Sequence, residues 1–433
     1  MKWNQLWLGV GLVLLLGACC LTSCDEVTED DRHVHKWGLW ETVNEPDCIK
    51  KGLRRRECAC LEKEEVIIPS LGHTPGVWVV DRSATLTEDG EMHRDCAVCG
   101  ERLQNEVIYK GSQGLAYKIQ GKECIITGIG ECQDTDLMIP SRLEGAEVTQ
   151  IAADAFRWNK TITSVVFPES VTTIGAGAFA WCDQLNSVTL PTGITVLEEK
   201  IFQGCGSLTE ILLPDGLRTV GAGAFDDCIA LKRMEIPSEV TEIGEHAFSD
   251  CIALTEVLLN EKLESVGAWA FSGCAQLDYI SIPAGVHQIE PYCFYDCIGL
   301  TQIGLPDTIE QIGNYAFAGC KNLSQISFSD RLQSLGDFAL KDCLKLTGVG
   351  IPASVKTLGR GVFMGCVGLT QITLFAGLEC IEANLFSGCV RLSNINFNGT
   401  KAQWNDLVKN DGWDKQTPGY EIICTDGTLK KPR

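Results

Sequence analysis

Apolar residues return along most of this chain with a period of 23 residues. One period reads LTEILLPDGLRTVGAGAFDDC (208–228), and its extended part places Ile211 and Leu213 on one side, because side chains alternate along a strand. Pro214 then ends the strand, since proline cannot donate a ladder hydrogen bond. The rest of the period predicts one turn of helix that carries Phe225 to the opposite wall.

The same position of every period holds a phenylalanine, replaced once by leucine. These residues are Phe156, Phe179, Phe202, Phe225, Phe248, Phe271, Phe294, Phe317, Leu340, Phe363 and Phe386. Each step is 23 residues, without insertion, across eleven units. A single unit cannot bury its apolar side, whereas stacked units cover one another, so the period predicts a solenoid. Each buried phenylalanine is expected to contribute about 1.5–3 kcal/mol to its stability.

A cysteine follows three residues after each of these positions, apart from Asn159 in the first unit. The ten cysteines are Cys182, Cys205, Cys228, Cys251, Cys274, Cys297, Cys320, Cys343, Cys366 and Cys389. Their constant position favours small buried thiols in the core. Disulfides along the row are the alternative, although identical parallel side chains rarely present the required torsion.

Residues 33–105 contain a second repeat, with a shift of 38 residues. The segment HKWGLWETVNEPDCIKKGLRRREC (35–58) aligns with HTPGVWVVDRSATLTEDGEMHRDC (73–96), and histidine, tryptophan, glycine, arginine and cysteine coincide. Modules this short have too little core to fold without a staple. We therefore expect two small His/Cys modules in which cysteine chemistry is structural.

The candidate metal ligands of the first module are His35, Cys48, Cys58 and Cys60. Thiolate and imidazole ligands suit a tetrahedral zinc ion, so a structural zinc is one interpretation. The second copy has Leu86 in place of the loop cysteine and lacks a ligand unless His93 stands in. Disulfides, which an extracytoplasmic location favours, and simple packing stay open as alternatives. No cofactor for function is expected.

The first residues read as a secretory signal. Lys2 precedes an apolar stretch over 6–18, which is too short for a comfortable membrane span. The tetrapeptide LTSC is similar to a bacterial lipobox, which predicts a lipoprotein signal peptide over residues 1–23 and lipid attachment at Cys24. Cys19, in LGAC, is the alternative attachment site.

An acidic stretch, DEVTEDD, follows the lipobox. It resembles the export signal that sends some lipoproteins of Gram-negative bacteria to the outer face of the outer membrane. The alternative is a disordered acidic tether over residues 24–32, and the two interpretations are compatible. Contact with the membrane is expected through the lipid anchor only.

Charge and composition argue against two classes of function. The formal net charge of −21 disfavours nucleic acid, because a phosphate-binding surface needs an excess of lysine and arginine. The basic run KKGLRRR (50–56) is explained more simply as a solvated strand face. No set of serine, histidine and acid suggests a catalytic site, since His246 and His287 lie in separate repeats. The protein is therefore not expected to be an enzyme.

The repeat also carries a family resemblance. The pattern C-x-x-L-x-x-I-x-L-P, followed by V-x-x-I-G-x-x-A-F at a period of 23 residues, resembles the BspA-like leucine-rich repeat family of bacterial surface proteins. The resemblance covers about residues 107–424. It implies an α/β solenoid of about eleven units with an N-terminal and a C-terminal cap.

The expected boundaries follow from these patterns. An N-terminal cap over 106–148 leads into the leucine-rich repeat solenoid over 149–397, and a C-terminal cap and tail occupy 398–433. Thr400 and Gln403 form a capping box, which predicts a short helix over the last open rung.

The resemblance implies adhesion. The expected protein is lipid-anchored at the bacterial outer membrane, displayed on the surface, and bound to a protein of the host matrix or of a neighbouring cell surface. The alternative is a surface lipoprotein that captures a nutrient such as a glycan. Tyr279 is the single stacking aromatic expected on the concave sheet, which disfavours a sugar.

The outward positions of the concave sheet are the default place for a partner. Charged residues and leucines gather in its N-terminal half, and large side chains carry most interface energy. The candidate binding residues are Glu210, Leu212, Arg233, Glu235, Glu256, Leu258 and Tyr279. The alternative is a solvated sheet that binds nothing.

Overall fold

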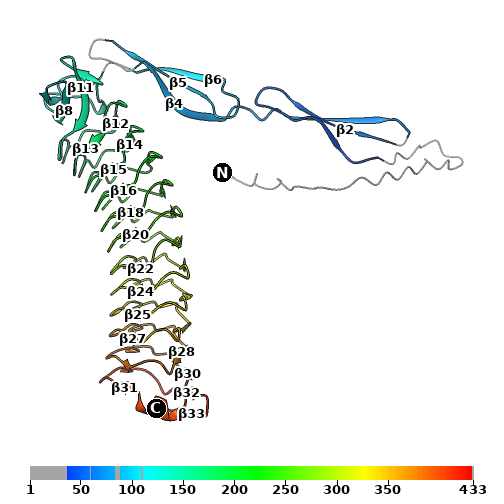
Figure 1. Ribbon diagram of the computed structural model, residues 1–433, viewed down its shortest axis with the longest axis vertical. Coiled ribbons are helices and arrows are strands. Elements are labelled where there is room, and N and C mark those ends of the chain that lie inside the picture. Colours follow the sequence, from blue (N-terminus) through cyan, green and yellow to red (C-terminus); the bar gives the residue numbers. More distant parts are fainter. Residues whose placement is uncertain (1–36, 59, 83–87, 109–110, 432–433) are drawn as a thin grey trace. The chain divides into compact units, whose positions relative to one another are not determined.

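The computed structural model describes residues 37–58, 60–82, 88–108 and 111–431 (Figure 1). The chain divides into two compact units, one holding the described residues up to Asp81 with Glu91–Glu106, the other Arg82–Gly90 with the chain from Val107 onward. The predicted signal peptide, Cys24 and His35 lie outside the described residues. Within the described part, we find no helix with the length and apolarity needed to cross a membrane.

Two three-stranded sheets make up the first unit. The first sheet contains β1 (Glu41–Asn44), β2 (Gly52–Glu57) and β3 (Lys63–Ile68), and the second contains β4 (Pro75–Arg82), β5 (Gly90–Cys96) and β6 (Arg102–Ile108). Equivalent contacts recur at the 38-residue shift, because Arg56 lies 4.7 Å from the ring of Trp40 and Arg94 lies 4.9 Å from the ring of Trp78. Each module is thus a small sheet with an arginine packed on a tryptophan.

The second unit opens with a hairpin and continues as a column of stacked coils (Figure 1). The opening strands are β7 (Ala116–Gln120), β8 (Glu123–Gly128), β10 (Arg142–Leu143) and β11 (Ala146–Ile151). The reversed strand β7 pairs with β8, which in turn pairs in parallel with β11. From there on, the coils contribute short parallel strands to two ladders, each of which is divided into separate hydrogen-bonded sheets.

The first ladder contains the strand that precedes the proline position of each period, which is Asn260, Ser329, Phe375 or Asn398 in four of them. Its strands are β9 (Asp136–Met138), β12 (Ser164–Val166), β14 (Ser187–Thr189), β17 (Arg233–Glu235), β19 (Glu256–Leu258), β21 (Tyr279–Ser281), β23 (Gln302–Gly304), β26 (Gly348–Gly350), β28 (Gln371–Phe375), β30 (Asn394–Asn398) and β32 (Glu421–Cys424). Residues 210–212 and 325–327 keep the alternation of an exposed, a buried and an exposed side chain but are not strands. The ladder is therefore interrupted at these two rungs, and it is also divided between β19 and β21, which belong to separate sheets.

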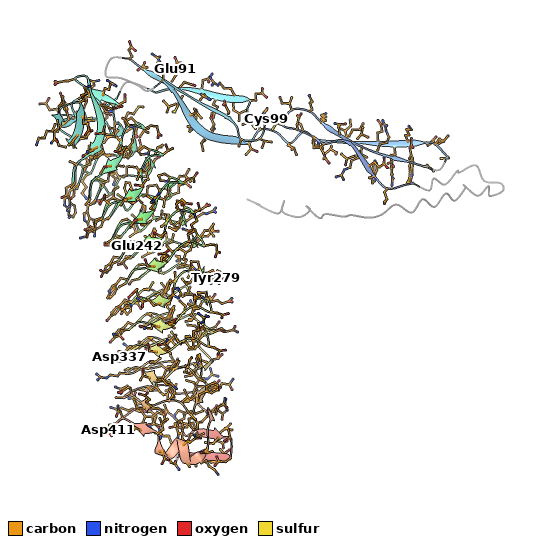
Figure 2. The ribbon with its side chains drawn as sticks, in the orientation of Figure 1. Glu91, Cys99, Glu242, Tyr279, Asp337 and Asp411 are labelled. Carbon is orange, nitrogen blue, oxygen red and sulfur yellow. The ribbon has the colours of Figure 1, made fainter. Side chains whose placement is uncertain are left out.

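The second ladder was not predicted. It starts at β8 and β11 and continues through β13 (Thr173–Ile174), β15 (Val196–Leu197), β16 (Thr219–Val220), β18 (Glu242–Ile243), β20 (Ser265–Val266), β22 (Gln288–Ile289), β24 (Gln311–Ile312), β25 (Ser334–Leu335), β27 (Thr357–Leu358), β29 (Cys380–Ile381) and β31 (Val408–Lys409). Most of its strands are two residues long, too short to produce a visible alternation in the sequence. Figure 2 shows Glu242 of this ladder and Tyr279 of the first ladder on opposite sides of the column.

The sequence analysis predicted one turn of helix in each coil, and this prediction is wrong. The fold is a β-solenoid of about 13 turns with very little helix. In the coil of Phe179, the N–H groups of Ala178, Ala180 and Cys182 donate three residues back along the chain. The intervening N–H groups, such as that of Phe179, donate instead to the next coil, where the acceptor is Ile201. An α-helix needs every N–H to donate four residues back, so this alternation excludes it.

Residues 175–182 and their equivalents in the other coils form a third side of the column, which we call the turn wall. Its backbone takes a positive φ at intervals, as at Gly177 (63°) and Trp181 (63°), which interrupts each turn before a helix can propagate. Consecutive turns of this kind, instead of a turn of helix, carry the phenylalanine to the opposite wall. The column therefore has three walls, and hydrogen bonds join neighbouring coils on each.

The phenylalanine row forms the centre of the column, as predicted. Neighbouring rings stack with centroids 4.9–5.9 Å apart in the run from Phe156 to Phe317 and in the pair Phe363–Phe386. Leu340 fills the same position and is equally buried. One core cluster extends from Leu115 to Cys424.

The ten cysteines form a row of buried thiols, which confirms their assignment to the core. Each sulfur donates to the carbonyl of the phenylalanine position on the preceding coil, as Cys182 does to Phe156 at 3.1 Å and Cys389 to Phe363 at 3.0 Å. The exception is Asn159 in the first unit, where the coil before it has Gln133 at the phenylalanine position. The Asn159 side chain instead accepts from nearby backbone N–H groups of its own loop.

The C-terminal end of the column is closed by α1 (Lys401–Asp406) and by β33 (Gly427–Lys430). Thr400 and Gln403 satisfy each other's backbone in a capping box, as predicted. Trp404 is buried and packs edge-on against Phe397, with ring centroids 5.1 Å apart. The reversed strand β33 pairs with β32, the last strand of the first ladder.

The buried thiols predict a steep loss of stability at alkaline pH. Burial raises the pKa of Cys182 to about 12, above the ordinary 9.0. It also raises the pKa of Cys205, Cys228, Cys251, Cys274, Cys297, Cys320, Cys343 and Cys389. Because unfolded thiols ionise at a lower pH than these, stability is full below about pH 9 and falls as the pH rises.

Each such thiol changes the unfolding free energy by about 1.4 kcal/mol per pH unit, and a whole domain has only about 5–15 kcal/mol. We therefore expect the array, kept reduced, to unfold within about one to two units above pH 9, measured as the urea midpoint against pH. The matched variant replaces Cys228, Cys251 and Cys274 by alanine and should lower the alkaline slope by about a third. An unchanged slope would contradict the assignment.

Candidate functional site

The outer face of the first ladder holds the predicted binding residues. Strands β17, β19 and β21 alternate, so their buried centres are Met234, Val257 and Ile280 while their flanking side chains face solvent. The exposed flanking residues are Arg233, Glu235, Glu256, Leu258, Tyr279 and Ser281. We call this surface, together with Glu210 and Leu212 on the preceding coil, the ladder face.

Large apolar side chains are exposed on the ladder face. The exposed fraction is 87% for Leu212, 41% for Leu258 and 52% for Tyr279. Tyr279 extends toward the next rung, because a Cβ atom added at Gly304 would lie 2.9 Å from the tyrosine hydroxyl. The glycine therefore leaves room for the ring on the surface.

Charge on the ladder face is mainly negative. Arg233 lies opposite Glu256 on the neighbouring strand, with Nε 3.3 Å from the carboxylate, and also approaches Glu235 at 3.7 Å. Exposed ion pairs of this kind contribute little to stability, so they cost little to rearrange around a partner. Glu210 adds another carboxylate at the N-terminal edge.

An open depression of about 430 Å³ lies between the rungs of β19 and β21. Its lining includes Leu258, Tyr279 and Pro283 as apolar surface, and the acidic residues Glu256, Glu261 and Asp278. The combination of an apolar floor and carboxylates suits a cationic side chain with an aliphatic stem.

The turn wall carries an aromatic stack that sequence reasoning missed. Its members are His246, Trp269, Tyr292, Tyr315 and Phe338, one on each of five consecutive coils. Neighbouring ring centroids are 3.9–5.5 Å apart, and all five residues have φ between 56° and 60°. The spacing of 23 residues between them was a visible signal in the sequence.

The stack ends at Gly361, where a Cβ atom would lie 2.5 Å from the ring of Phe338. Because the rings face one another, they present mainly their edges to solvent, which leaves little face for a sugar to stack on. Each ring pair contributes about 0.5–1.5 kcal/mol, and a left-handed backbone at a bulky residue opposes it. The stack is therefore a structural feature of the turn wall.

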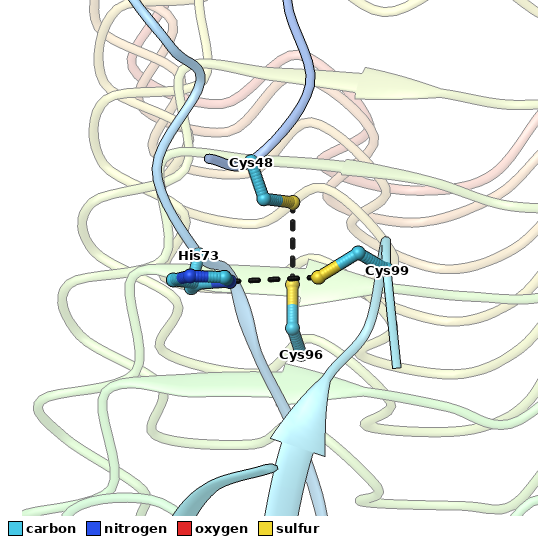
Figure 3. Close-up of side chains that lie close together, drawn as sticks. All are labelled: Cys48, His73, Cys96 and Cys99. Carbon is cyan, nitrogen blue, oxygen red and sulfur yellow. Dashed lines mark hydrogen bonds between the residues drawn. The ribbon is translucent and has the colours of Figure 1, made fainter. Parts of the chain in front are cut away.

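A cluster of sulfur and nitrogen atoms lies where the two modules meet (Figure 3). Cys48, His73, Cys96 and Cys99 place one ligand atom each within 4.8 Å of all the others and could hold a metal ion. The sulfur atoms of Cys48 and Cys96 are 3.5 Å apart, and that of Cys99 lies 3.5 Å from Nδ1 of His73.

The sulfur of Cys96 is prepared for ionisation. Solvent exclusion opposes its charge, but the N–H groups of Cys99 and Val98 point at the sulfur, His73 contributes a further hydrogen bond, and together they lower its pKa to about 5. Gly100, with φ of 73°, turns the chain so that its N–H donates back to the carbonyl of Cys96. The segment from Cys96 to Gly100 thus forms a tight cysteine turn.

The structure places the predicted ligands differently from the sequence analysis. Cys48 belongs to the cluster of the second module, and neither Cys58 nor Cys60 is part of that cluster. His93 does not replace a ligand, because its ring nitrogens contact the carboxylates of Asp81 and Asp95 at 2.6 and 3.2 Å. The set with His35 is not tested, since that residue lies outside the described part.

Comparison with known proteins supports the repeat assignment. The family of the BspA type leucine-rich repeat region matches residues 149–278, 219–306 and 287–408, which together cover more than half of the chain. The pattern of this family consists of six repeat copies. No match was found among curated proteins.

Several solved structures are similar. A leucine-rich repeat protein from Bacteroides ovatus is 23% identical, with 72% of this chain and 98% of that chain covered and a TM-score of 0.46. A leucine-rich cell surface protein from Faecalibacterium prausnitzii is 25% identical, with 69% and 97% covered and a TM-score of 0.41. The pneumococcal vaccine antigen PcpA is 18% identical, with 68% and 88% covered and a TM-score of 0.48.

The aromatic stack generates a prediction about glycine. Tyr292→Ala loses ring stacking and keeps a side chain on a left-handed backbone, whereas Tyr292→Gly loses the same ring and relieves that strain. We expect the glycine variant to be the more stable by about 1 kcal/mol in urea unfolding. Tyr279, in an ordinary strand, is the matched control, and there alanine should be the more stable. The same order at both positions would contradict the interpretation.

Proposed function

The chain belongs to the BspA-type leucine-rich repeat family, and we propose that it is a surface-displayed binding protein that holds a protein partner on the ladder face. Repeats of this kind are in general non-enzymatic binding scaffolds. The observation that carries the proposal is the exposure of Leu212, Leu258 and Tyr279 on one wall, because large apolar anchors dominate interface energy.

The chemistry of the ladder face favours a basic partner segment with apolar side chains. Glu210, Glu235 and Glu256 outnumber Arg233 on this surface, and the depression beside Tyr279 adds carboxylates to its rim. Opposite charges steer association and select among partners. A protein of the host matrix or of a neighbouring cell is the partner class in this proposal. A captured glycan is the alternative outcome.

The proposed location is the outer membrane, with the array outside the cell. The lipobox-like LTSC and the acidic stretch after it support this, and one similar solved protein is itself described as a cell surface protein. A single lipid chain gives only marginal anchoring, so stable attachment through Cys24 requires more than one lipid chain.

The first test is binding of residues 25–433 to arrays of matrix proteins and glycans. Leu258→Ala and Tyr279→Ala should each weaken binding to the captured protein by about tenfold or more, since a lost anchor costs about 2 kcal/mol. Glu256→Lys should weaken binding of a basic partner, while the same change at Glu242 on the second ladder is the control. Binding that is unaffected by all three ladder-face changes would overturn the proposal, and capture of glycans alone would replace the protein partner.

The anchor is tested separately. Cys24→Ala should release the protein from membranes into the soluble fraction, because it removes the atom that carries the lipid. Cys19→Ala, five residues upstream, is the control and should leave the protein in the membrane fraction. Incorporation of a labelled fatty acid into the Cys24→Ala variant would contradict the predicted attachment site.

A further inference from the structure

We propose that Cys48, His73, Cys96 and Cys99 bind one zinc ion, and that this ion clamps the two small sheets together. The proposal concerns the architecture of the first unit and does not depend on partner binding. It differs from the sequence-based ligand set, because the ligands come from both modules instead of from one.

The interatomic distances fit tetrahedral zinc. Bonds of about 2.3 Å to sulfur and about 2.0–2.1 Å to nitrogen give tetrahedral edges of about 3.8 Å between sulfurs and about 3.6 Å between sulfur and nitrogen. Two edges of the cluster, Cys48 to Cys96 and Cys99 to His73, are 3.5 Å long. Because all four atoms lie within 4.8 Å of one another, small side-chain movements would complete the tetrahedron.

The ligands arrive from three separate segments. Cys48 lies in the loop between β1 and β2, His73 lies in the linker between β3 and β4, and Cys96 with Cys99 belongs to the turn between β5 and β6. Backbone hydrogen bonds already dock the linker on both sides. The N–H of Leu71 donates to Asp47 at 2.8 Å, and the carbonyl of Thr74 accepts from Ala97 at 2.8 Å.

Surrounding groups orient these ligands. Nε2 of His73 lies 3.5 Å from the carboxylate of Glu101, which leaves Nδ1 facing the sulfurs. A carboxylate on the far nitrogen is the usual support of a zinc-binding histidine. On the other side, Oδ1 of Asp47 accepts from the N–H groups of Ile49 and Lys50, at 2.8 and 2.5 Å, which fixes the loop around Cys48.

The donor set selects the metal. Three sulfurs and one imidazole are soft ligands that exclude magnesium and calcium, which prefer oxygen. Four protein ligands complete the coordination of zinc and leave no open position for a substrate, so the ion would be structural. Small sheets with exposed apolar side chains gain stability directly from such an ion.

The shared arrangement also explains an irregularity of the repeat. The first module supplies its loop cysteine, Cys48, to the module that follows it. The equivalent position of the second module is Leu86, which lies outside the described residues, and the segment that follows this module is the repeat array instead of a third module. A module with no successor of its kind needs no cysteine to donate.

The two modules also differ in the length of the turn that carries their cysteines. In the second module, the N–H of Cys96 donates to the carbonyl of Glu101, whereas in the first the N–H of Cys58 donates to Glu62, so the turn is one residue shorter. Cys60 is therefore not placed as Cys99 is. The cluster among the described residues takes both of its turn ligands, Cys96 and Cys99, from the second module.

The test is native mass spectrometry of residues 25–433, purified under reducing conditions, with zinc as the probe. We expect one zinc per chain, lost with Cys48→Ser and with Cys99→Ser, each of which should weaken zinc binding by more than about 100-fold. Cys58→Ser is the matched control and should keep the metal. Substitution of zinc by cobalt should give the visible spectrum of a tetrahedral thiolate site.

Two further readouts distinguish a zinc ion that joins the two sheets from cysteines that only pack together. Glu101→Gln should weaken zinc binding by about 10- to 100-fold without removing a ligand. Chelation should open the linker over 69–74 to proteases in the wild type. Metal retained in Cys99→Ser but lost in Cys58→Ser would move the site into the first module. A metal-free chain, or one with a Cys48–Cys96 disulfide in place of zinc, would overturn the proposal.

Discussion

Hydrogen bonding between neighbouring coils on all three walls is the constraint on which the array depends. It requires each coil to repeat after 23 residues, because one extra residue would move every donor away from its acceptor. The same translation stacks the phenylalanine rings and brings each thiol below a carbonyl of the preceding coil. Packing and hydrogen bonding thus reinforce a single period, and the eleven units contain no insertion.

Sequence reasoning predicted which features repeat along the chain and which side chains are buried. The period, the phenylalanine row and the thiols followed from residue types that can be recognised one by one. The wall geometry did not follow, because a row of turns and a helix both bring residues three apart to one side. Gly177 and Trp181 decide between them through their backbone conformation, and a tryptophan gives no signal that it will adopt a positive φ.

The candidate site residues divide in the same way. The ladder face was predictable, because alternation fixes which side of a strand each residue occupies. The cluster of Cys48, His73, Cys96 and Cys99 was not, since alignment of the two modules suggested that each would hold its own ligands. Tertiary packing brings Cys48 to the turn of the other module, and only the docking of the linker around Leu71 and Thr74 shows this. The aromatic stack could have been found from its spacing alone.

The two reversed strands at the ends of the column have a consequence for assembly. A parallel ladder with a constant translation leaves complementary backbone groups at its two ends, so that one copy could continue another head to tail. Such open contacts generate filaments instead of closed oligomers. Strand β7 runs against β8 at one end, and β33 runs against β32 at the other. A strand of opposite direction cannot extend the parallel register, so each of these two strands opposes head-to-tail polymerisation of the array.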